Sequence, residues 1–283
     1  MRFKINTPAT AYSIDIYRMG YYAGNGARKV ARISPSAALP QQQDDCDTDD
    51  TTGLIDCGNW TESASWQVPA DAVSGIYFAH LVRTDGEDDD NHIVFVVRDE
   101  ARHADMVFKT SDSTWQAYNK WGGNSLYNGD SVVAPGRAVK VSYNRPFGTR
   151  EDTPWGRDFV FANEYPMVRF LEANGYDVSY IGSIDADMRG QLIRNHKAFL
   201  SVGHDEYWSK NERANVEAAR DAGVHLAFFS GNEVYWKTRW ENGMGASGEA
   251  GRTLVTYKET RANAKIDPSP EWTGTWRDPR FSP

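Results

Sequence analysis

The pattern of apolar and polar positions changes about one third of the way along the chain. Before residue 99, the apolar residues fall in short runs such as SGIYFAHLVR and NHIVFVVR, which the turn segment TDGEDDD separates. The segment YSIDIYRMG alternates polar and apolar positions through Ile14 and Ile16. Short strands with Gly and Asp turns are typical of antiparallel β-sandwiches. We therefore predict an antiparallel, immunoglobulin-like β-sandwich over residues 1–99, and expect part of it to be missing before Met1.

Beyond residue 100, short apolar runs alternate with segments of helical character. The runs are MVFKTS, VKVSYN, YDVSYIG, KAFLSVG and VHLAFFSG, and we predict that all five are buried strands. The helical segments between them are NEYPMVRFLEANG, DADMRGQLIRN and SKNERANVEAARDAGV. Such alternation predicts an α/β domain with a largely parallel sheet. We expect a three-layer domain of the flavodoxin-like or glutamine amidotransferase-like kind over residues 100–283.

Two features mark the ends of this second half. In its last helical segment, Ser209 and Glu212 form a capping box and Gly223 ends the helix. We place the boundary between the halves near VRDEARHADM. The C-terminal stretch TLVTYKETRANAKIDPSPEWTGTWRDPRFSP is predicted to be loop-like, and we expect the chain to stop inside a longer protein.

Polar side chains follow two of the predicted strands. The run KAFLSVG is followed by His204, Asp205 and Glu206, and the run VHLAFFSG is followed by Asn232 and Glu233. A right-handed helical crossover brings the carboxyl ends of both strands to one rim of a parallel sheet, where ligands bind. Each of these residues alone is explained more simply by a turn or an ion pair, but together they favour a functional site. We expect Asp205 and Glu233 to have no role in this site. For Asp205, an exposed position in a turn is the simpler explanation.

Composition narrows the class of protein. The 283 residues are 40% hydrophobic and carry a formal net charge of -8 without a basic run, which argues against nucleic-acid binding. No apolar stretch approaches the roughly 20 residues of a membrane span. The N-terminus has no apolar leader, so we expect a cytoplasmic protein, or a secreted one whose leader is missing. Cys46 and Cys57 flank the segment DTDDTTGLID, and either a disulfide or two free thiols fit this spacing.

Five motifs in the second half resemble those of a known family. TWQAYNKWGGNSLY, VSYNRPF, SVGHDEYWS, FFSGNEVYW and GTWRDP occur in this order. Together they resemble the C-terminal domain of the N,N-dimethylformamidase large (β) subunit family. The earlier segments IDIYRMGYYAGNGARKV and LIDCGNWTESASWQVP resemble the β-sandwich that often precedes it. The resemblance covers nearly the whole chain.

The resemblance implies a metal site. The characterised enzyme of the family hydrolyses a small amide at a mononuclear iron centre, held by two tyrosines and one glutamate. The glutamate of the His-x-Glu motif falls on Glu206, and the tyrosines fall on Tyr118 and Tyr127. The loop between the two tyrosines is shorter here than in the family, and Tyr143 is the alternative ligand. A hard set of three oxygen ligands suits Fe³⁺.

The resemblance also implies two catalytic residues, His204 and Asn232. His204 would orient water or relay a proton, and Asn232 would donate to a developing oxyanion. The expected function is a metal-dependent amidohydrolase, a hydrolase of linear amides, with a small amide as its substrate. The alternative is a non-catalytic or divergent secreted relative, such as a surface module that binds carbohydrate. Assembly as a homo-oligomer or with a small accessory subunit stays open. A further glutamate of the family has no assigned position here.

Overall fold

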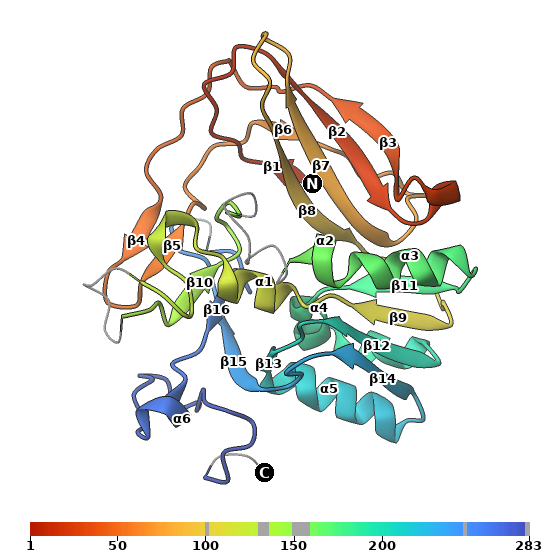
Figure 1. Cartoon of the computed structure of the whole chain (residues 1–283). Coiled ribbons are helices and arrows are strands. Elements are labelled where there is room, and N and C mark those ends of the chain that lie inside the picture. The colour runs from red at the N-terminus through yellow and green to blue at the C-terminus, as the bar shows by residue number, and fades with distance from the viewer. Residues whose placement is uncertain (100–101, 130–135, 149–158, 246–247, 281–283) are drawn as a thin grey trace.

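The structure is a computed structural model, and it describes residues 1–99, 102–129, 136–148, 159–245 and 248–280. The chain forms a mixed α/β arrangement with several sheets, some parallel and some antiparallel (Figure 1). Among the described residues, no helix is both long enough and apolar enough to cross a membrane.

The N-terminal part is built on a four-stranded antiparallel sheet. Its strands lie in the order β3 (Ala27–Ile33), β2 (Tyr12–Met19), β7 (Gly75–Arg83) and β8 (Asp90–Val97). β1 (Arg2–Phe3) pairs with β6 (Ala64–Ser65), and η1 (Tyr22–Gly24) follows β2. Ile14 and Ile16 are fully buried on one face of β2, in a core with Phe3, Trp66 and Tyr77. The predicted strand alternation is confirmed here.

A small hairpin leaves this part of the chain and lies beside the second half. β4 (Asp47–Asp49) pairs with β5 (Leu54–Asp56), and a disulfide joins Cys46 to Cys57 across it. Of the two states left open by the spacing, the structure therefore shows the disulfide. β5 lies next to β10 (Lys140–Ser142), and Asp56, fully buried, accepts a hydrogen bond from the backbone of Met244.

The second half contains the predicted parallel sheet, in the order β11-β9-β12-β14. Its strands are β9 (Met106–Lys109), β11 (Val178–Ile181), β12 (Ala198–Gly203) and β14 (His225–Ser230). One face packs on α2 (Val160–Asn163) and α3 (Tyr165–Ala173), and the other on α4 (Ser183–Met188), η4 (Gly190–Asn195) and α5 (Lys210–Asp221). The expected capping box of Ser209 and Glu212 opens α5, and Gly223 follows it at φ +97°.

Three expectations for this half are wrong. VKVSYN forms the predicted strand, β10, but this strand is not part of the parallel sheet. TLVTYK was expected to be loop but supplies a strand, β16 (Thr253–Val255). Both strands belong to a second sheet, in the order β10-β16-β15-β13. The other members are β15 (Trp236–Glu241) and β13 (Tyr207–Ser209). β14 is an edge strand, so its Phe228 and Phe229 are 43% and 54% exposed. An apolar run indicates burial of some side chains but does not specify which strand it pairs with.

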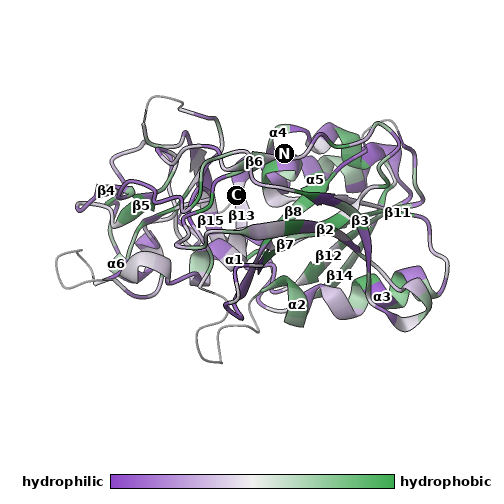
Figure 2. Cartoon of the chain, turned by 90° about the horizontal axis from the view of Figure 1, so that it is seen from above, coloured by the Kyte–Doolittle hydropathy of each residue, from purple (hydrophilic) through white to green (hydrophobic). Residues whose placement is uncertain are grey.

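The two halves share one hydrophobic core. Met19 and Ile76 of the antiparallel sheet pack in the same cluster as Phe108 and Tyr180 of the parallel sheet. Seen from above, the antiparallel sheet lies over the parallel one, and strands β8, β12 and β14 are mostly hydrophobic (Figure 2). Arg18 crosses this contact: it donates to the carbonyl oxygen of Ser74 and forms an ion pair of 2.7 Å with Glu172. The domain boundary near residue 100 stays a prediction.

Candidate metal centre

Glu206 lies in the short turn between β12 and β13, at the carboxyl end of the parallel sheet. It is 5% exposed, and its backbone is fully engaged. Its N–H donates to Oγ1 of Thr114 (3.2 Å), and its carbonyl oxygen accepts from the N–H groups of Tyr235 (3.0 Å) and Trp236 (2.9 Å). A short turn held at both backbone groups fixes the direction of its side chain.

The two strand ends that the sequence placed on one rim are joined by backbone hydrogen bonds. Gly231 N–H donates to the carbonyl oxygen of Gly203 (3.3 Å), and Val234 N–H donates to that of Asp205 (3.1 Å). Gly203 has φ +96°, and a Cβ there would come within 2.8 Å of Ser111 Oγ and 2.9 Å of Glu164 Oε1. Glycine is therefore required at this turn by both its dihedral and its surroundings.

Two tyrosines reach the carboxylate of Glu206. Tyr118, the last residue of α1 (Asp112–Tyr118), donates its hydroxyl to Oε2 at 3.0 Å. The Tyr127 hydroxyl lies 2.9 Å from Oε1 and 3.0 Å from Oε2. The two rings stack with centroids 4.3 Å apart. Burial first, and then the charge of Glu206, raise the pKa of both phenols, so both hydroxyls are protonated at neutral pH.

A buried arginine folds the loop that carries these tyrosines. Arg145, of the Arg-Pro pair, is 5% exposed and donates four hydrogen bonds of 2.6–3.1 Å to backbone carbonyl oxygens. Burial lowers its pKa to about 9, which still leaves the guanidinium charged at neutral pH. This one side chain ties together the segment that includes η2 (Trp121–Gly123). The four carbonyls belong to Gln116, Asn119, Trp121 and Asn124.

Tyr143, the alternative ligand, points elsewhere. Its hydroxyl donates to Oδ2 of Asp112 (2.8 Å), at the first residue of α1. Asp112 also accepts hydrogen bonds from Thr110 Oγ1 and from the backbone of Ser183. The structure therefore brings Tyr118 and Tyr127 to Glu206, and it places Tyr143 in a separate network at the start of the helix.

His204 and Asn232 lie beside the same carboxylate. Nε2 of His204 is 3.4 Å from Oε2 of Glu206, and Nδ2 of Asn232 is 3.2 Å from that ring nitrogen. Asn232 and Val234 both have φ +52°. This conformation is unusual for Val234, which is β-branched. Local strain of this kind concentrates at functional sites. The backbone bonds from residues 231–236 to the Glu206 turn hold this conformation in place.

A comparison with known families identifies the family of the chain. The model of the family described as N,N-dimethylformamidase beta subunit-like, C-terminal, matches residues 13–283. The chain belongs to this family. The description of the family points to a dimethylformamidase-like hydrolase. A search of curated proteins found no match.

The burial of Asp205 differs from the expectation. It was expected to be an exposed turn residue, but it is fully buried. It accepts hydrogen bonds from Lys109 Nζ and from Ser201 Oγ (2.6 Å), and Nζ of Lys109 also lies 2.6 Å from Oε1 of Glu212. Its neighbours His204 and Glu206 point to the rim, whereas the side chain of Asp205 points into the core and forms an ion pair with Lys109.

Two further residues at this centre were not predicted from the sequence: Tyr207 and Lys258. Tyr207 donates its hydroxyl to that of Tyr127 (2.6 Å), and Nζ of Lys258 lies 3.5 Å from the centroid of the Tyr127 ring. Tyr207 directly follows Glu206, the last residue of the His-x-Glu motif. This adjacency was the feature of the sequence that could have indicated a role for Tyr207. Lys258 had none, because it lies in a segment expected to be loop, 132 residues from its hydrogen-bond acceptor, Leu126.

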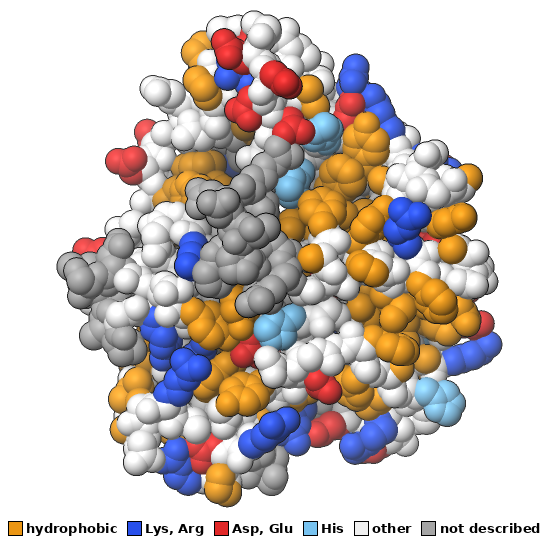
Figure 3. Space-filling view, in the orientation of Figure 1, with side chains coloured by type: hydrophobic (Ala, Val, Ile, Leu, Met, Phe, Trp, Pro, Cys, Tyr) orange, Lys and Arg blue, Asp and Glu red, His pale blue; other side chains and the backbone are white. Residues whose placement is uncertain are grey.

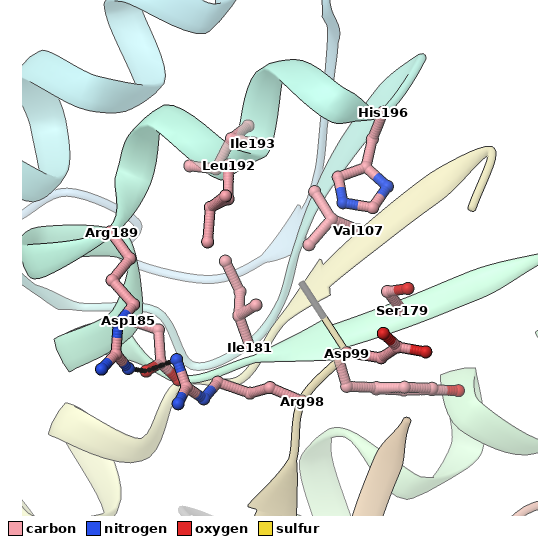
Figure 4. Close-up of a pocket in the computed structure, with 11 residues that line it drawn as sticks. Arg98, Asp99, Val107, Ser179, Ile181, Asp185, Arg189, Leu192, Ile193 and His196 are labelled. Carbon is pink, nitrogen blue, oxygen red and sulfur yellow. Dashed lines mark ion pairs between the residues drawn. The ribbon is translucent and has the colours of Figure 1, made fainter. Parts of the chain in front are cut away.

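Two other features help to delimit the site. Among the described residues, no three His, Cys, Asp or Glu side chains are grouped so as to hold a metal ion, so a metal at this centre depends on the phenol oxygens. A small pocket of about 20 Å³ lies between β11 and the α4–η4 segment (Figure 4). It has room for about one water molecule, and an ion pair of Arg98 with Asp185 borders it. This pocket does not include the Glu206 centre.

On the face drawn in Figure 3, basic and acidic side chains are interspersed and form no continuous basic field.

Proposed function

We propose that the protein is a metal-dependent amidohydrolase that cleaves the C–N bond of a small amide at a mononuclear iron site. Tyr118, Tyr127 and Glu206 would hold the ion. The observation that carries this proposal is the convergence of two phenol oxygens on one buried carboxylate, within 3.0 Å. This convergence occurs at the carboxyl end of a parallel sheet, where ligands bind in α/β proteins.

The residues present fit a hard, highly charged ion. All of the proposed donors are oxygens, which favours Fe³⁺ over softer metals. Phenols whose pKa is raised by burial and by a carboxylate release their protons only to a strong Lewis acid. When bound, the ion would polarise the amide carbonyl group and acidify a water molecule.

The protein groups beside the ligands supply the proton transfers. A neutral His204 imidazole would accept a proton from the attacking water and return it to the departing amine nitrogen. Asn232 would donate its amide N–H to the oxygen that becomes negatively charged. Their positions support these roles, because Nε2 of His204 lies 3.4 Å from Oε2 of Glu206 and Nδ2 of Asn232 lies 3.2 Å from that nitrogen. The overall reaction converts an amide and water into a carboxylic acid and an amine.

We also infer that the two halves correspond to an immunoglobulin-like sandwich and a flavodoxin-like three-layer domain. The four-stranded antiparallel sheet with its buried face supports the first assignment. The parallel order β11-β9-β12-β14, with helices against both faces, supports the second.

Metal analysis and an absorption spectrum test the function. We expect about one iron per chain, a tyrosinate-to-iron charge-transfer band, and release of amine from small formamides or acetamides. Glu206→Ala should lose the metal, the band and the activity, while Tyr143→Phe should keep all three because its hydroxyl bonds to Asp112. A Glu206→Ala protein with full metal content would contradict the ligand assignment. A wild-type protein that takes up no ferric ion would favour the non-catalytic relative.

A further inference from the structure

The hydroxyl of Tyr127 has a partner besides Glu206. Tyr207, the first residue of β13, is fully buried and donates its own hydroxyl to the Tyr127 oxygen at 2.6 Å. The Tyr118 hydroxyl donates to Glu206, and its ring lies 5.5 Å from that of His204, at the more open side of the centre. The two tyrosines therefore share a carboxylate but have different surroundings.

Lys258 contacts Tyr127 from the opposite side. Its side chain is fully buried, and Nζ lies 3.5 Å from the centroid of the Tyr127 ring and 4.9 Å from that of Trp236. Nζ also donates to the carbonyl oxygen of Leu126, the residue before Tyr127, at 3.1 Å. One amino group thus contacts both the ring and the backbone of this tyrosine.

The backbone around Lys258 is arranged to hold it there. Lys258 has φ +50°, and its N–H donates to Oγ1 of Thr256. The next residue, Glu259, is fully buried, and its carboxylate accepts three backbone hydrogen bonds. The donors are the N–H groups of Ile266, Asp267 and Thr273. The C-terminal loop, including α6 (Glu259–Ala262), is thereby folded around the position from which Lys258 enters the core.

We propose that Tyr207 and Lys258 are positioning residues for Tyr127 that make the two tyrosine ligands unequal. Tyr207 fixes the Tyr127 oxygen by a hydrogen bond, and Lys258 fixes the ring and the preceding peptide group. A phenolate that accepts a hydrogen bond is a weaker electron donor than one that accepts none. Tyr127 is then the rigid, weaker donor, and Tyr118 is the stronger one, on the side of His204 and Asn232. The ligand part of this inference rests on the proposed function.

Fluorine NMR of the metal-free protein tests the positioning without any metal. 3-Fluorotyrosine is placed at position 127 in one sample and at position 118 in another. Tyr207→Phe and Lys258→Met should each shift and broaden the signal from position 127, and should move the signal from position 118 by a smaller amount because the two rings stack. Tyr143→Phe, a buried tyrosine hydroxyl removed outside the centre, should move neither signal. If Lys258→Met does not fold, Lys258→Arg and Tyr207→Phe are compared.

Ferric loading then tests the inequality of the ligands. Tyr207→Phe should move the charge-transfer band to longer wavelength, because Tyr127 becomes a stronger donor, and should weaken ferric affinity about tenfold, from the loss of one hydrogen bond to a charged group. An unchanged signal from position 127 in both variants, or equal changes at positions 127 and 118, would overturn the inference. If the wild type binds no ferric ion, the proposed function fails, while the NMR result still decides the positioning roles.

Discussion

Two fully buried lysines flank the turn that carries Glu206, and their surroundings differ. Lys109 lies at the end of β9 between the carboxylates of Asp205 and Glu212. Burial alone would lower its pKa, but the two carboxylates outweigh this effect and the pKa is raised. Lys258 lies among aromatic rings, and burial, followed by the positive charge of Arg137, lowers its pKa well below the ordinary value. Equal burial therefore gives opposite shifts, and the neighbours decide the sign.

The difference separates two tasks at one centre. Lys109 binds the Asp205 side chain from within the core and so holds the turn between His204 and Glu206 in place. Lys258 contacts a proposed ligand directly and has no ion pair with a carboxylate among the residues that the structure describes. The ion pairs of Lys109 thus serve mainly the stability of the turn, whereas the role proposed for Lys258 is to position Tyr127.

The largest effect should follow from removing the ionic partner. Lys109→Met leaves Asp205 and Glu212 buried without a cation, which should lower the free energy of unfolding by about 3–5 kcal/mol. Urea unfolding at neutral pH measures this. Adding Glu212→Gln removes one of the two buried carboxylates that have lost their cation. The double variant should therefore recover part of the lost free energy of unfolding. A loss below about 1 kcal/mol would show that the ion pairs of Lys109 do not hold the turn.

A third buried group extends the comparison to a carboxylate without a cation. Glu164 is fully buried and accepts hydrogen bonds from the Ser111 backbone and from Trp115 Nε1, and burial raises its pKa from 4.5 to about 7. Between these values the unfolded chain has lost this proton and the folded protein keeps it, so stability should fall as the pH rises from about 5 to 7.

The size of this effect is bounded by the pKa shift. It amounts to at most about 3 kcal/mol at 1.36 kcal/mol per unit. Urea unfolding of the wild type and of Glu164→Gln at several pH values between 4 and 8 measures it, because glutamine cannot ionise and keeps a similar shape. The difference in stability between the two proteins should change with pH in this window. A constant difference would mean that Glu164 does not titrate there.

The parallel sheet could be predicted because its signals are local. Apolar runs of four to six residues gave β9, β11, β12 and β14, and the box of Ser209 and Glu212 gave the start of α5. In the second sheet, only β10 was predicted as a strand. β13 and β16 have three residues each, which is too short for a periodic pattern to show, and the six residues of β15 form no apolar run. Their pairing depends on contacts between distant segments.

In the candidate centre, too, some residues could be predicted from local sequence and others could not. Glu206, His204 and Asn232 could be placed on one rim because strand topology alone brings their loops together. Tyr118 and Tyr127 came from the resemblance to a family, since phenol ligands are rare. The burial of Asp205 could not be foreseen, because its cation, Lys109, lies 96 residues away. Long-range partners of this kind leave no mark in the local sequence.

The smallest effect on stability should come from the second lysine. Lys258→Met replaces an amino group by an apolar chain of similar length among aromatic rings, and the main loss is one hydrogen bond to the Leu126 carbonyl oxygen. We expect the free energy of unfolding to fall by about 1–2 kcal/mol, which is less than the Lys109→Met effect. Parallel urea unfolding of the two variants gives the ratio. A loss as large as that of Lys109→Met would mean that Lys258 also acts as a buried counter-ion, for which Glu206 is the carboxylate at hand.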